Sequence, residues 1–411
     1  MSSPIAPSVR ALELLGSYEA GWSLPQPFYV DDEFYALDVE HVLVPSWLFV
    51  THDCEVPNPG DWVRIDLFDD SIIVVRGNDG EVRSFFNTCR HRGSIVCLDQ
   101  AGHSRRLVCP YHKWTYNLDG SFAGARYLPD DFEAELFGLS PVHCETIGGY
   151  VFVCLADDAP DISAFAGAAE QFLAPHGLQD VKVAHTETII EHANWKLVME
   201  NNRECYHCGH AHPELMQTID EFDGPGSSRH NDKFLAILEK KLTGWNSDGI
   251  VHEQTTEGGL EWRLVRIPFT NDGVAMTIDG SPASNKILGT LRESQRDLGS
   301  VRMLHFPNTW NHVQSDHVVS FSLLPLSADE TELTTRWLVH KDAVQGVDYD
   351  LDHLTKVWVA TNGQDRILVE NNHRGIGSRG YRPGPYAPGI ETGTADFTSW
   401  YTTMLHKGLT G

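Results

Sequence analysis

The chain has 411 residues, with 31 lysines and arginines against 57 aspartates and glutamates, which gives a formal net charge of −26. A surface this acidic repels nucleic acid and anionic membranes, so we expect neither as a partner, whereas a small cationic or zwitterionic substrate is compatible with it. Hydrophobic residues make up 41% and charged residues 21%, an ordinary globular composition, and the length predicts two domains.

The first residues, 1–20, show no basic start followed by an apolar run, so we expect no signal peptide and a cytoplasmic protein. No apolar run approaches the roughly 18 residues that a bilayer span needs. Eight cysteines in a chain this long do not suggest a disulfide framework. Four of them lie close to histidines, which favours metal binding in a reducing compartment.

The N-terminal part predicts an arm, a helix and then a β block. A helix is expected from Asp31, a fair N-cap, through about Val44, because Pro45 stops it. From residue 47 to about 154 the hydrophobic period is two, and the turn at residues 77–80 lies between two strand-like runs. We therefore predict a small all-β domain over residues 46–156.

Two loops of this β block carry two cysteine and histidine pairs: Cys89, His91, Cys109 and His112. A tetrahedral set of two thiolates and two imidazoles suits structural zinc, and the same ligands suit a Rieske [2Fe–2S] cluster. Gly93 and Pro110 fit tight loops whose backbone N–H groups point at bridging sulfides. The context therefore favours the cluster over zinc.

Residues 1–45 and 157–411 are expected to form the second domain, with mixed structure. Helices are predicted at residues 162–176, 195–208 and 348–372, and residues 213–259 are polar and irregular enough to form a lid. Strands are expected at residues 181–191, 262–267, 274–278, 301–306, 318–324 and 332–340. Their pairing should be antiparallel because the connections are short or lack helices. The tail around residues 382–389 should be extended.

A second group of candidate ligands lies in one short segment. On the predicted helix Glu204 and His207 are three residues apart and share a face. Pro213 disfavours the helical conformation at His212, so His212 can turn back from a loop. These two histidines and one distant carboxylate would form a facial triad with open positions for O2. His210, also three residues from His207, is the rival ligand.

The last long helix supplies a candidate for that carboxylate. Its inward stripe recurs at spacings of four and three residues: Leu354, Trp358, Thr361, Asp365 and Leu368. A buried carboxylate is costly unless it meets a cation, so Asp365 is a candidate iron ligand. The alternative is an ion pair between Asp365 and a nearby arginine: Arg366, Arg374 or Arg379.

Taken together, these motifs resemble the oxygenase (α) subunits of the Rieske non-haem iron oxygenases. The resemblance covers nearly the whole chain and is closest to the quaternary-ammonium branch, with glycine betaine monooxygenase and stachydrine (proline betaine) demethylase. Its most specific segments are residues 23–29, 89–94, 107–112, 194–207, 337–343, 346–349 and 382–386.

The resemblance implies an α+β fold, in which an all-β Rieske [2Fe–2S] domain is inserted in an antiparallel helix-grip (START-like) catalytic domain. It assigns the loop cysteines and histidines to the cluster, and His207, His212 and Asp365 to a mononuclear Fe(II), which demotes His210. Glu204 matches the acid that bridges the two metal centres across a subunit interface of a homotrimer. Ring-hydroxylating members usually have aspartate there, so the glutamate points away from aromatic dihydroxylation.

The implied activity is O2-dependent N-demethylation of a betaine, with glycine betaine giving dimethylglycine and formaldehyde. Electrons would come from NAD(P)H through a separate flavin and ferredoxin-type reductase, because no Gly-rich dinucleotide loop follows a strand here. A permanent cation calls for aromatic faces, although core packing competes at each position. Weak pocket candidates are Tyr206, Phe306, Trp310 and Phe321 for the cation, His305, Asn311 and His312 for the carboxylate, and Asn201 near iron.

Three other functions remain open at this point. The first is demethylation of proline betaine or a related N-methyl compound. The second is ring or alkyl hydroxylation by the same machinery. The third, from a different class, is a non-catalytic ligand-binding protein with a structural zinc.

Overall fold

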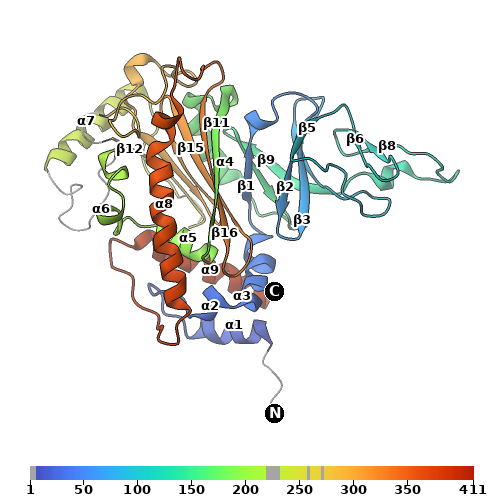
Figure 1. The fold of residues 1–411 in the computed structure, drawn as a ribbon, viewed down its shortest axis with the longest axis horizontal. Helices are drawn as coiled ribbons and strands as arrows, with labels where there is room; N and C mark the ends of the chain where they lie inside the picture. Colours follow the sequence, from blue (N-terminus) through green and yellow to red (C-terminus); the bar gives the residue numbers. More distant parts are fainter. Residues whose placement is uncertain (1–5, 219–231, 257–259, 270–272) are drawn as a thin grey trace, which may run out of the picture. The chain divides into compact units, whose positions relative to one another are not determined.

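The computed structural model describes residues 6–218, 232–256, 260–269 and 273–411. The chain forms two compact units, one made of Met1–Val44 with Asp161–Gly411 and the other of Pro45–Pro160. The smaller unit is therefore inserted in the sequence of the larger one (Figure 1). Among the residues so described, no helix combines the length and the apolar character that crossing a bilayer requires.

The smaller unit consists of two antiparallel sheets. The larger sheet has seven strands in the order β1-β10-β9-β4-β3-β2-β5, and the smaller has the order β6-β7-β8. The bounds are β1 Leu48–His52, β2 Asp61–Leu67, β3 Asp70–Arg76, β4 Val82–Phe86, β5 Ala101–His103, β6 Leu107–Val108, β7 Thr115–Tyr116, β8 Phe122–Gly124, β9 Pro141–Ile147 and β10 Tyr150–Cys154. The predicted all-β block and its β3–β4 hairpin are confirmed.

Aromatic side chains form the core of the smaller unit around Trp114. The rings of Phe122, Phe132 and Phe137 meet the Trp114 ring edge-on at centroid distances of 4.9, 5.7 and 5.8 Å. The same buried cluster contains Cys89 and Cys109. The two loops that carry the candidate cluster ligands are therefore seated directly on a rigid aromatic core.

The larger unit is built on one six-stranded antiparallel sheet with the order β11-β16-β15-β14-β13-β12. Its strands are β11 Val181–Glu191, β12 Trp262–Ile267, β13 Ser300–His305, β14 Thr309–Val313, β15 His317–Pro325 and β16 Thr331–His340. The antiparallel pairing is as predicted. The strand expected at residues 274–278 is wrong, because Val274 donates to the Gly280 carbonyl and the segment closes into a turn.

The helices with described bounds are α1 Pro7–Gly16, α2 Pro27–Val30, α3 Asp32–Asp38, α4 Ser163–Leu173, α5 Trp195–Asn202, α6 Cys208–Ala211, α7 Asp232–Asp248, α8 Leu351–Ile376 and α9 Thr392–Thr410. The helix predicted from Asp31 is present and continues from α3 as a π turn, Val39–Leu43.

Two predictions in this unit need correction, and one helix was not predicted. The single helix expected over residues 195–208 is two helices, α5 and α6, because the chain turns between Arg203 and His207. The segment 213–259, expected to be irregular, contains α7, and residues 219–231 and 257–259 of it lie outside the described part. The extended tail is followed by α9, whose buried Phe397, Trp400 and Tyr401 recur at helical spacing.

The six-stranded sheet is covered on both faces. On one face the Phe165 ring of α4 packs against Trp262 of β12, with 5.7 Å between centroids. On the other face Trp358 of α8 packs against Phe321 and His312, with centroid distances of 5.0 and 4.6 Å. Figure 1 shows α8 running along this sheet. A long helix held against a curved antiparallel sheet is the predicted helix-grip arrangement, and it is confirmed.

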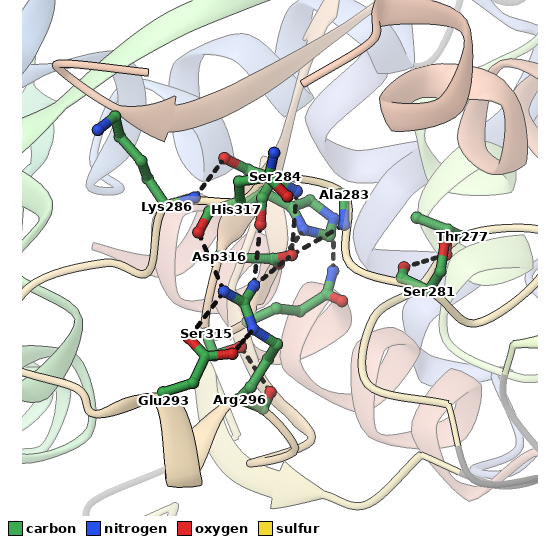
Figure 2. Close-up of polar contacts among 12 residues, drawn as sticks. Thr277, Ser281, Ala283, Ser284, Lys286, Glu293, Arg296, Ser315, Asp316 and His317 are labelled. Atoms are coloured by element: carbon green, nitrogen blue, oxygen red, sulfur yellow. Dashed lines mark hydrogen bonds and ion pairs between the residues drawn. The ribbon is translucent and has the colours of Figure 1, made fainter. Parts of the chain in front are cut away.

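A buried polar network fixes the turn between β14 and β15 (Figure 2). The Asp316 carboxylate accepts hydrogen bonds from the backbone N–H groups of Ala283 and Ser284, at 2.8 and 3.1 Å, and from His317 Nδ1 at 2.7 Å. Arg296 donates to the Ser284 carbonyl at 2.9 Å. These bonds tie the long connection between β12 and β13 to the end of the β14–β15 hairpin, so that end of the sheet is rigid.

Candidate metal centres and substrate cavity

Each of the two loops in the smaller unit folds back on its own cysteine. Gly93 N–H donates to the Cys89 carbonyl at 2.9 Å, and Lys113 N–H donates to the Cys109 carbonyl at 3.1 Å. Gly93 has φ +79° and Lys113 has φ +62°, the left-handed conformation that closes such a turn. Glycine adopts this conformation without strain. A lysine does not, so at the second loop the surrounding structure holds Lys113 in the left-handed conformation.

The two loops bring two buried thiols and two exposed imidazoles together. The residues Cys89 and Cys109 are 3% and 1% exposed, and the His91 and His112 rings lie at the surface, 4.6 Å apart between centroids. The His91 ring stacks on Trp114 at 5.0 Å, which holds its orientation. A Rieske cluster needs an inner iron with two thiolates and an outer iron with two imidazoles, so these residues fit it.

The Tyr116 hydroxyl lies 3.2 Å from Cys89 Sγ. Because the Arg90 N–H already donates to this hydroxyl oxygen at 3.0 Å, the hydroxyl proton is free to point at the sulfur. Burial raises the pKa of the Cys89 thiol, while the Tyr116 hydrogen bond lowers it. A thiolate here therefore needs stabilisation, which the hydroxyl and bound iron would both provide.

In the larger unit three candidate ligand atoms form a small triangle. His207 Nε2 and His212 Nε2 are 3.0 Å apart, and Asp365 Oδ1 lies 3.3 and 3.0 Å from them. Ligands about 2.1 Å from a metal and at right angles to one another are about 3.0 Å apart, so the spacing fits a facial triad. Asp365 Oδ1 is buried, and within the described residues its contacts with the two imidazoles are close approaches rather than well-aligned hydrogen bonds, as expected of atoms that share a metal ion.

The remaining ring nitrogens of both histidines are held by neighbours. His207 Nδ1 donates to Glu204 Oε1 at 2.6 Å, and His212 Nδ1 donates to Gln364 Oε1 at 2.8 Å. Gln364 is oriented in turn, because its Nε2 donates to Glu214 Oε2 at 2.7 Å. With Nδ1 held in this way, both imidazoles can offer Nε2 to a metal ion, as metal-binding histidines do.

Sequence reasoning missed both Gln364 and Glu214. The position of Gln364, directly before a candidate ligand on α8, was a usable signal. The position of Glu214 gave none.

Charge within the triangle favours a bound cation. Burial lowers the pKa of His207, but the carboxylates of Asp365 and Glu204 outweigh it and raise that pKa to about 9. Burial raises the pKa of Asp365, but the two imidazoles beside it outweigh burial and the pKa is lowered. The site thus attracts positive charge to the space between its ligand atoms, and a metal ion there would replace the protons.

Glu204 reaches His207 from a turn, since α5 ends at Asn202. The second oxygen of Glu204 accepts a hydrogen bond from the Tyr206 N–H, which fixes the carboxylate toward the ring. The predicted contact is therefore present, and the helix proposed to explain it is not.

Cys205 and Cys208 are joined by a disulfide across 4.9 Å between their Cα atoms. The expectation that cysteines beside histidines bind metal fails for this pair, because neither is a thiolate in this state. Cys208 Sγ lies 4.0 Å from His207 Nε2, close enough to share a metal ion, but the disulfide leaves it no thiolate, so Asp365 is the better third ligand.

A cavity of about 870 Å³ opens at the triangle. Several residues proposed from the sequence line it, namely Asn201, Glu204, His207, His212, Trp310, Asn311, His312 and Asp365. Asn201 Nδ2 lies 3.4 Å from His207 Nε2, so Asn201 is close to the metal position. Phe321 is stacked behind Trp310 at 5.2 Å and supports that wall. Trp358 of α8 also lines the cavity and was not proposed as a pocket residue.

Three proposed pocket residues lie elsewhere. Tyr206 is 55% exposed, and Phe306 packs between Phe397 and Trp400 of α9, at 5.2 Å from each ring centroid. His305 packs against Phe165 of α4, with 4.7 Å between ring centroids. None of the three contributes to the walls found among the described residues.

Strand alternation explains where His305 lies. It pairs with Trp262 and Thr309 on the sheet face covered by α4, whereas the cavity is on the α8 face. Four arginines that were not proposed do line the cavity: Arg203, Arg263, Arg266 and Arg302.

The two units match two family models in turn. Residues 46–133 match the Rieske [2Fe-2S] domain, and residues 178–407 match the ring hydroxylating alpha subunit (catalytic domain).

Two curated relatives are similar over almost their whole length. The chain is 42% identical over 412 residues to the glycine betaine monooxygenase oxygenase subunit of Pseudomonas aeruginosa, covering 100% of this chain and 95% of that protein. It is 44% identical over 411 residues to the glycine betaine monooxygenase oxygenase subunit of Chromohalobacter salexigens, covering 99% and 92%.

A solved structure is similar in fold over nearly the whole chain. It is a quaternary ammonium Rieske monooxygenase, described in relation to carnitine oxidation by gut microbiota and inter-subunit electron transfer. The TM-score is 0.71 at 25% sequence identity, with 95% of this chain and 98% of that chain covered.

Proposed function

Since this chain belongs to the Rieske non-haem iron oxygenases as an oxygenase (α) subunit, we propose that it catalyses O2-dependent N-demethylation of a quaternary ammonium betaine, with glycine betaine as the favoured substrate. The observation that carries this proposal is the 42–44% identity to two glycine betaine monooxygenase oxygenase subunits along nearly their entire chains. The geometry supports it, because both sets of candidate metal ligands are assembled. Demethylation of proline betaine is the alternative within the same chemistry.

The chemistry of the substrate determines what the protein has to do. A quaternary nitrogen has no lone pair, so oxidation has to begin at a C–H bond of an N-methyl group. One oxygen atom of O2 enters that bond, and two electrons and two protons reduce the other atom to water. The hydroxymethyl group then loses its hydroxyl proton as the C–N bond breaks, and the bond electrons return to nitrogen. The products are formaldehyde and the tertiary amine.

We propose that Cys89, His91, Cys109 and His112 hold a Rieske [2Fe–2S] cluster and that His207, His212 and Asp365 hold Fe(II). When bound, these groups supply the electrons and activate O2. The chain's own contribution is positional. Glu204 and Gln364 fix the tautomers of the two histidines, and the cavity walls determine which methyl group faces the metal.

Aromatic side chains in the cavity suit a permanent cation. Trp310 and Trp358 line it, and a tryptophan face within about 6 Å of a quaternary ammonium contributes roughly 0.5–2 kcal/mol. Phe321 stacks behind Trp310 and limits its movement, so the aromatic face is already in place before the substrate arrives.

We further propose a separate reductase that carries flavin and uses NAD(P)H, and a homotrimer of this chain. The relatives are named as oxygenase subunits, which supports a partner component, and the similar solved structure is described with inter-subunit electron transfer. Glu204, whose carboxylate already binds His207, is the residue that would lie between the iron of one subunit and the cluster of its neighbour.

The test is oxygen uptake and formaldehyde release by the purified protein with a surrogate reductase. Glycine betaine should give equal amounts of formaldehyde and dimethylglycine, and proline betaine is tested beside it. Hydroxylation without formaldehyde would replace the proposal with ring or alkyl hydroxylation. A colourless protein with zinc and no EPR signal on reduction would replace it with a non-catalytic function.

A further inference from the structure

Four arginines line the substrate cavity. Arg266 donates to the Val251 carbonyl and to His176 Nε2, and the other three, Arg203, Arg263 and Arg302, have been given no role so far. We propose that they bind the carboxylate of the substrate, so that the enzyme selects amino-acid betaines, which are zwitterions, over simple quaternary cations. The inference rests on the proposed function for the class of substrate, and it adds the specificity-determining site.

Arg203 is a partly buried residue with two buried, unused donor atoms. It follows α5, and its Nη2 donates to the carbonyl oxygen of Asn202 at 3.1 Å and also to the Asn202 side-chain oxygen. Its Nε and Nη1 are buried and have no hydrogen-bond acceptor among the described residues. Buried polar groups are almost always paired, and a buried charge without a partner is costly. An anion in the cavity would supply the missing acceptor.

The other two arginines come from adjacent strands of the sheet. Arg263 of β12 pairs with Leu304 of β13, and Arg302 lies two residues away on β13. Residues two apart on a strand point to the same face, so both guanidinium groups lie on the cavity side, as diagonal neighbours. The cavity therefore has a wall with positive charges from two strands, next to the Arg203 side chain.

The three charges are close enough to repel one another. Burial lowers the pKa of Arg203 well below its ordinary value, and the charges of Arg263 and Arg302 lower it further. Burial also lowers the pKa of Arg302 to about 9. Burial also lowers the pKa of Arg263, and the nearby Asp396 carboxylate partly offsets this effect. Arginine loses its proton with great difficulty, so a bound anion is the simplest way to relieve this repulsion.

The position of Arg203 is fixed by a close backbone contact. Gly393 of α9 lies against it, and a Cβ at position 393 would be only 2.4 Å from the Arg203 carbonyl oxygen. Glycine is therefore required there, and the start of α9 supports the Arg203 backbone. Gly393 itself lines the cavity, so this contact is part of the wall.

The rest of the cavity complements the cationic end of a betaine. Asp365 and the faces of Trp310 and Trp358 line it, and none of them repels a trimethylammonium group. His312 lies on the same wall, and burial together with Arg302 and Arg203 holds the pKa of His312 well below its usual range, so it is neutral. A zwitterion can thus place its ammonium group near the metal ligands and its carboxylate at the arginines.

The experiment is isothermal titration calorimetry on the intact holoenzyme without O2 or reductase. The probes are glycine betaine and choline, which share a trimethylammonium group and differ in carrying a carboxylate or a hydroxyl. The variants are Arg203→Gln and Arg203→Lys. Arg292→Gln is the matched control, because Arg292 is a surface residue with 64% of its side chain exposed. Melting temperature and the visible spectrum of each variant confirm that it is folded.

We expect the wild type to bind glycine betaine about 100-fold more tightly than choline, as a charge-assisted contact predicts. Arg203→Gln should weaken glycine betaine binding about 10-fold to 100-fold and leave choline binding within about twofold. Arg203→Lys should recover part of the loss, and the control should match the wild type. A folded Arg203→Gln variant that keeps the wild-type preference would overturn the inference.

Turnover separates this inference from the proposed function. Formaldehyde release from glycine betaine with an unchanged preference in Arg203→Gln would refute the arginine site alone. Selective binding that Arg203→Gln removes, without formaldehyde release from any methylated amine, would refute the demethylase proposal and leave the carboxylate site standing.

Discussion

Gln364 holds His212 by one hydrogen bond, 2.8 Å from its Oε1 to the ring Nδ1. The next residue on α8 is Asp365, whose carboxylate lies 3.0 Å from Nε2 of the same ring. One turn of α8 thus supplies a candidate ligand and the group that orients another ligand from a distant loop. The relative placement of the two ligands depends on a single helix, which is more rigid than a loop.

Gln364→Ala should reduce iron binding without unfolding the protein. The His212 ring would lose the acceptor that fixes its tautomer, and changes of this kind cost about 10-fold to 100-fold in metal affinity. Iron per protein after dialysis against a chelator checks this, with Gln171→Ala as the control because Gln171 is exposed on α4. Unchanged iron retention would show that Glu214 and Gln364 do not position the ring.

Glu204→Gln should keep both metals and slow electron transfer. The amide oxygen can still accept the proton of His207 Nδ1, so the ring stays in place, but the negative charge between the centres is lost. A fall of about tenfold or more in the single-turnover rate is expected, measured with a prereduced cluster and bound substrate. Wild-type turnover in this variant would remove Glu204 from the bridging role.

Tyr116→Phe should make the cluster a weaker oxidant. The hydroxyl 3.2 Å from Cys89 Sγ stabilises negative charge on the sulfur, which favours the reduced cluster. Removing a bond of about 1 kcal/mol lowers the reduction potential by about 40 mV, since about 1.4 kcal/mol corresponds to 59 mV for one electron. A redox titration followed by EPR measures it, and a potential at or above the wild-type value would contradict the role.

His176 should make the protein less stable in acid. Burial and the charge of Arg266, whose Nη2 lies 3.2 Å from Nε2, lower the pKa of His176 to about 3 and outweigh the opposing hydrogen bond from Nδ1 to the Gln314 carbonyl at 2.8 Å. The unfolded chain takes up a proton near pH 6.5, so this contribution is complete above that pH and is lost as pH falls toward 3. Between pH 7.5 and 5.5 the loss is about 1.4 kcal/mol.

The measurement for His176 is urea unfolding of the wild type and His176→Gln at both pH values. Other groups titrate equally in the two proteins, so only the difference in their pH dependence is attributed to His176. The variant should be less stable at pH 7.5 and should lose less stability on acidification. Parallel curves would show that His176 takes no part in acid destabilisation.

Much of the fold and most of the candidate ligands could be predicted from residues that are close together along the chain. The loops with Cys89 and Cys109 are closed by hydrogen bonds between residues four apart, so the spacing of cysteine and histidine along the chain was enough to predict these loops. Pro213 marked the place where His212 leaves the helical conformation. Asp365 was found because α8 is long and regular and the predicted stripe is buried at Leu354, Trp358 and Thr361, although Leu368, which was placed on the same stripe, is 37% exposed. Each of these inferences needed contacts only between near neighbours in sequence.

The failures have a common physical cause. The helix predicted over residues 195–208 ignored a turn that is stabilised by side-chain bonds of Glu204 and by the Cys205–Cys208 disulfide. His305 was predicted to line the pocket, but its neighbour Leu304 lines it and His305 points to the opposite face of the sheet. Which of two neighbouring strand residues points to the cavity is decided by what packs on each face of the sheet. Neither the helix propensity of the residues nor their spacing along the chain predicts this turn or the sheet face to which His305 points.

By itself the sequence determined the two metal-binding motifs, the β character of the inserted unit and the family to which the chain belongs, because each is written in residues close together along the chain. Only the tertiary structure decided how the cavity is lined. Arg203, Arg263 and Arg302 come from three separate elements, and Glu214 reaches Gln364 across 150 residues of sequence. Such contacts arise when α8 closes over the sheet, and no local pattern records which side chains then meet.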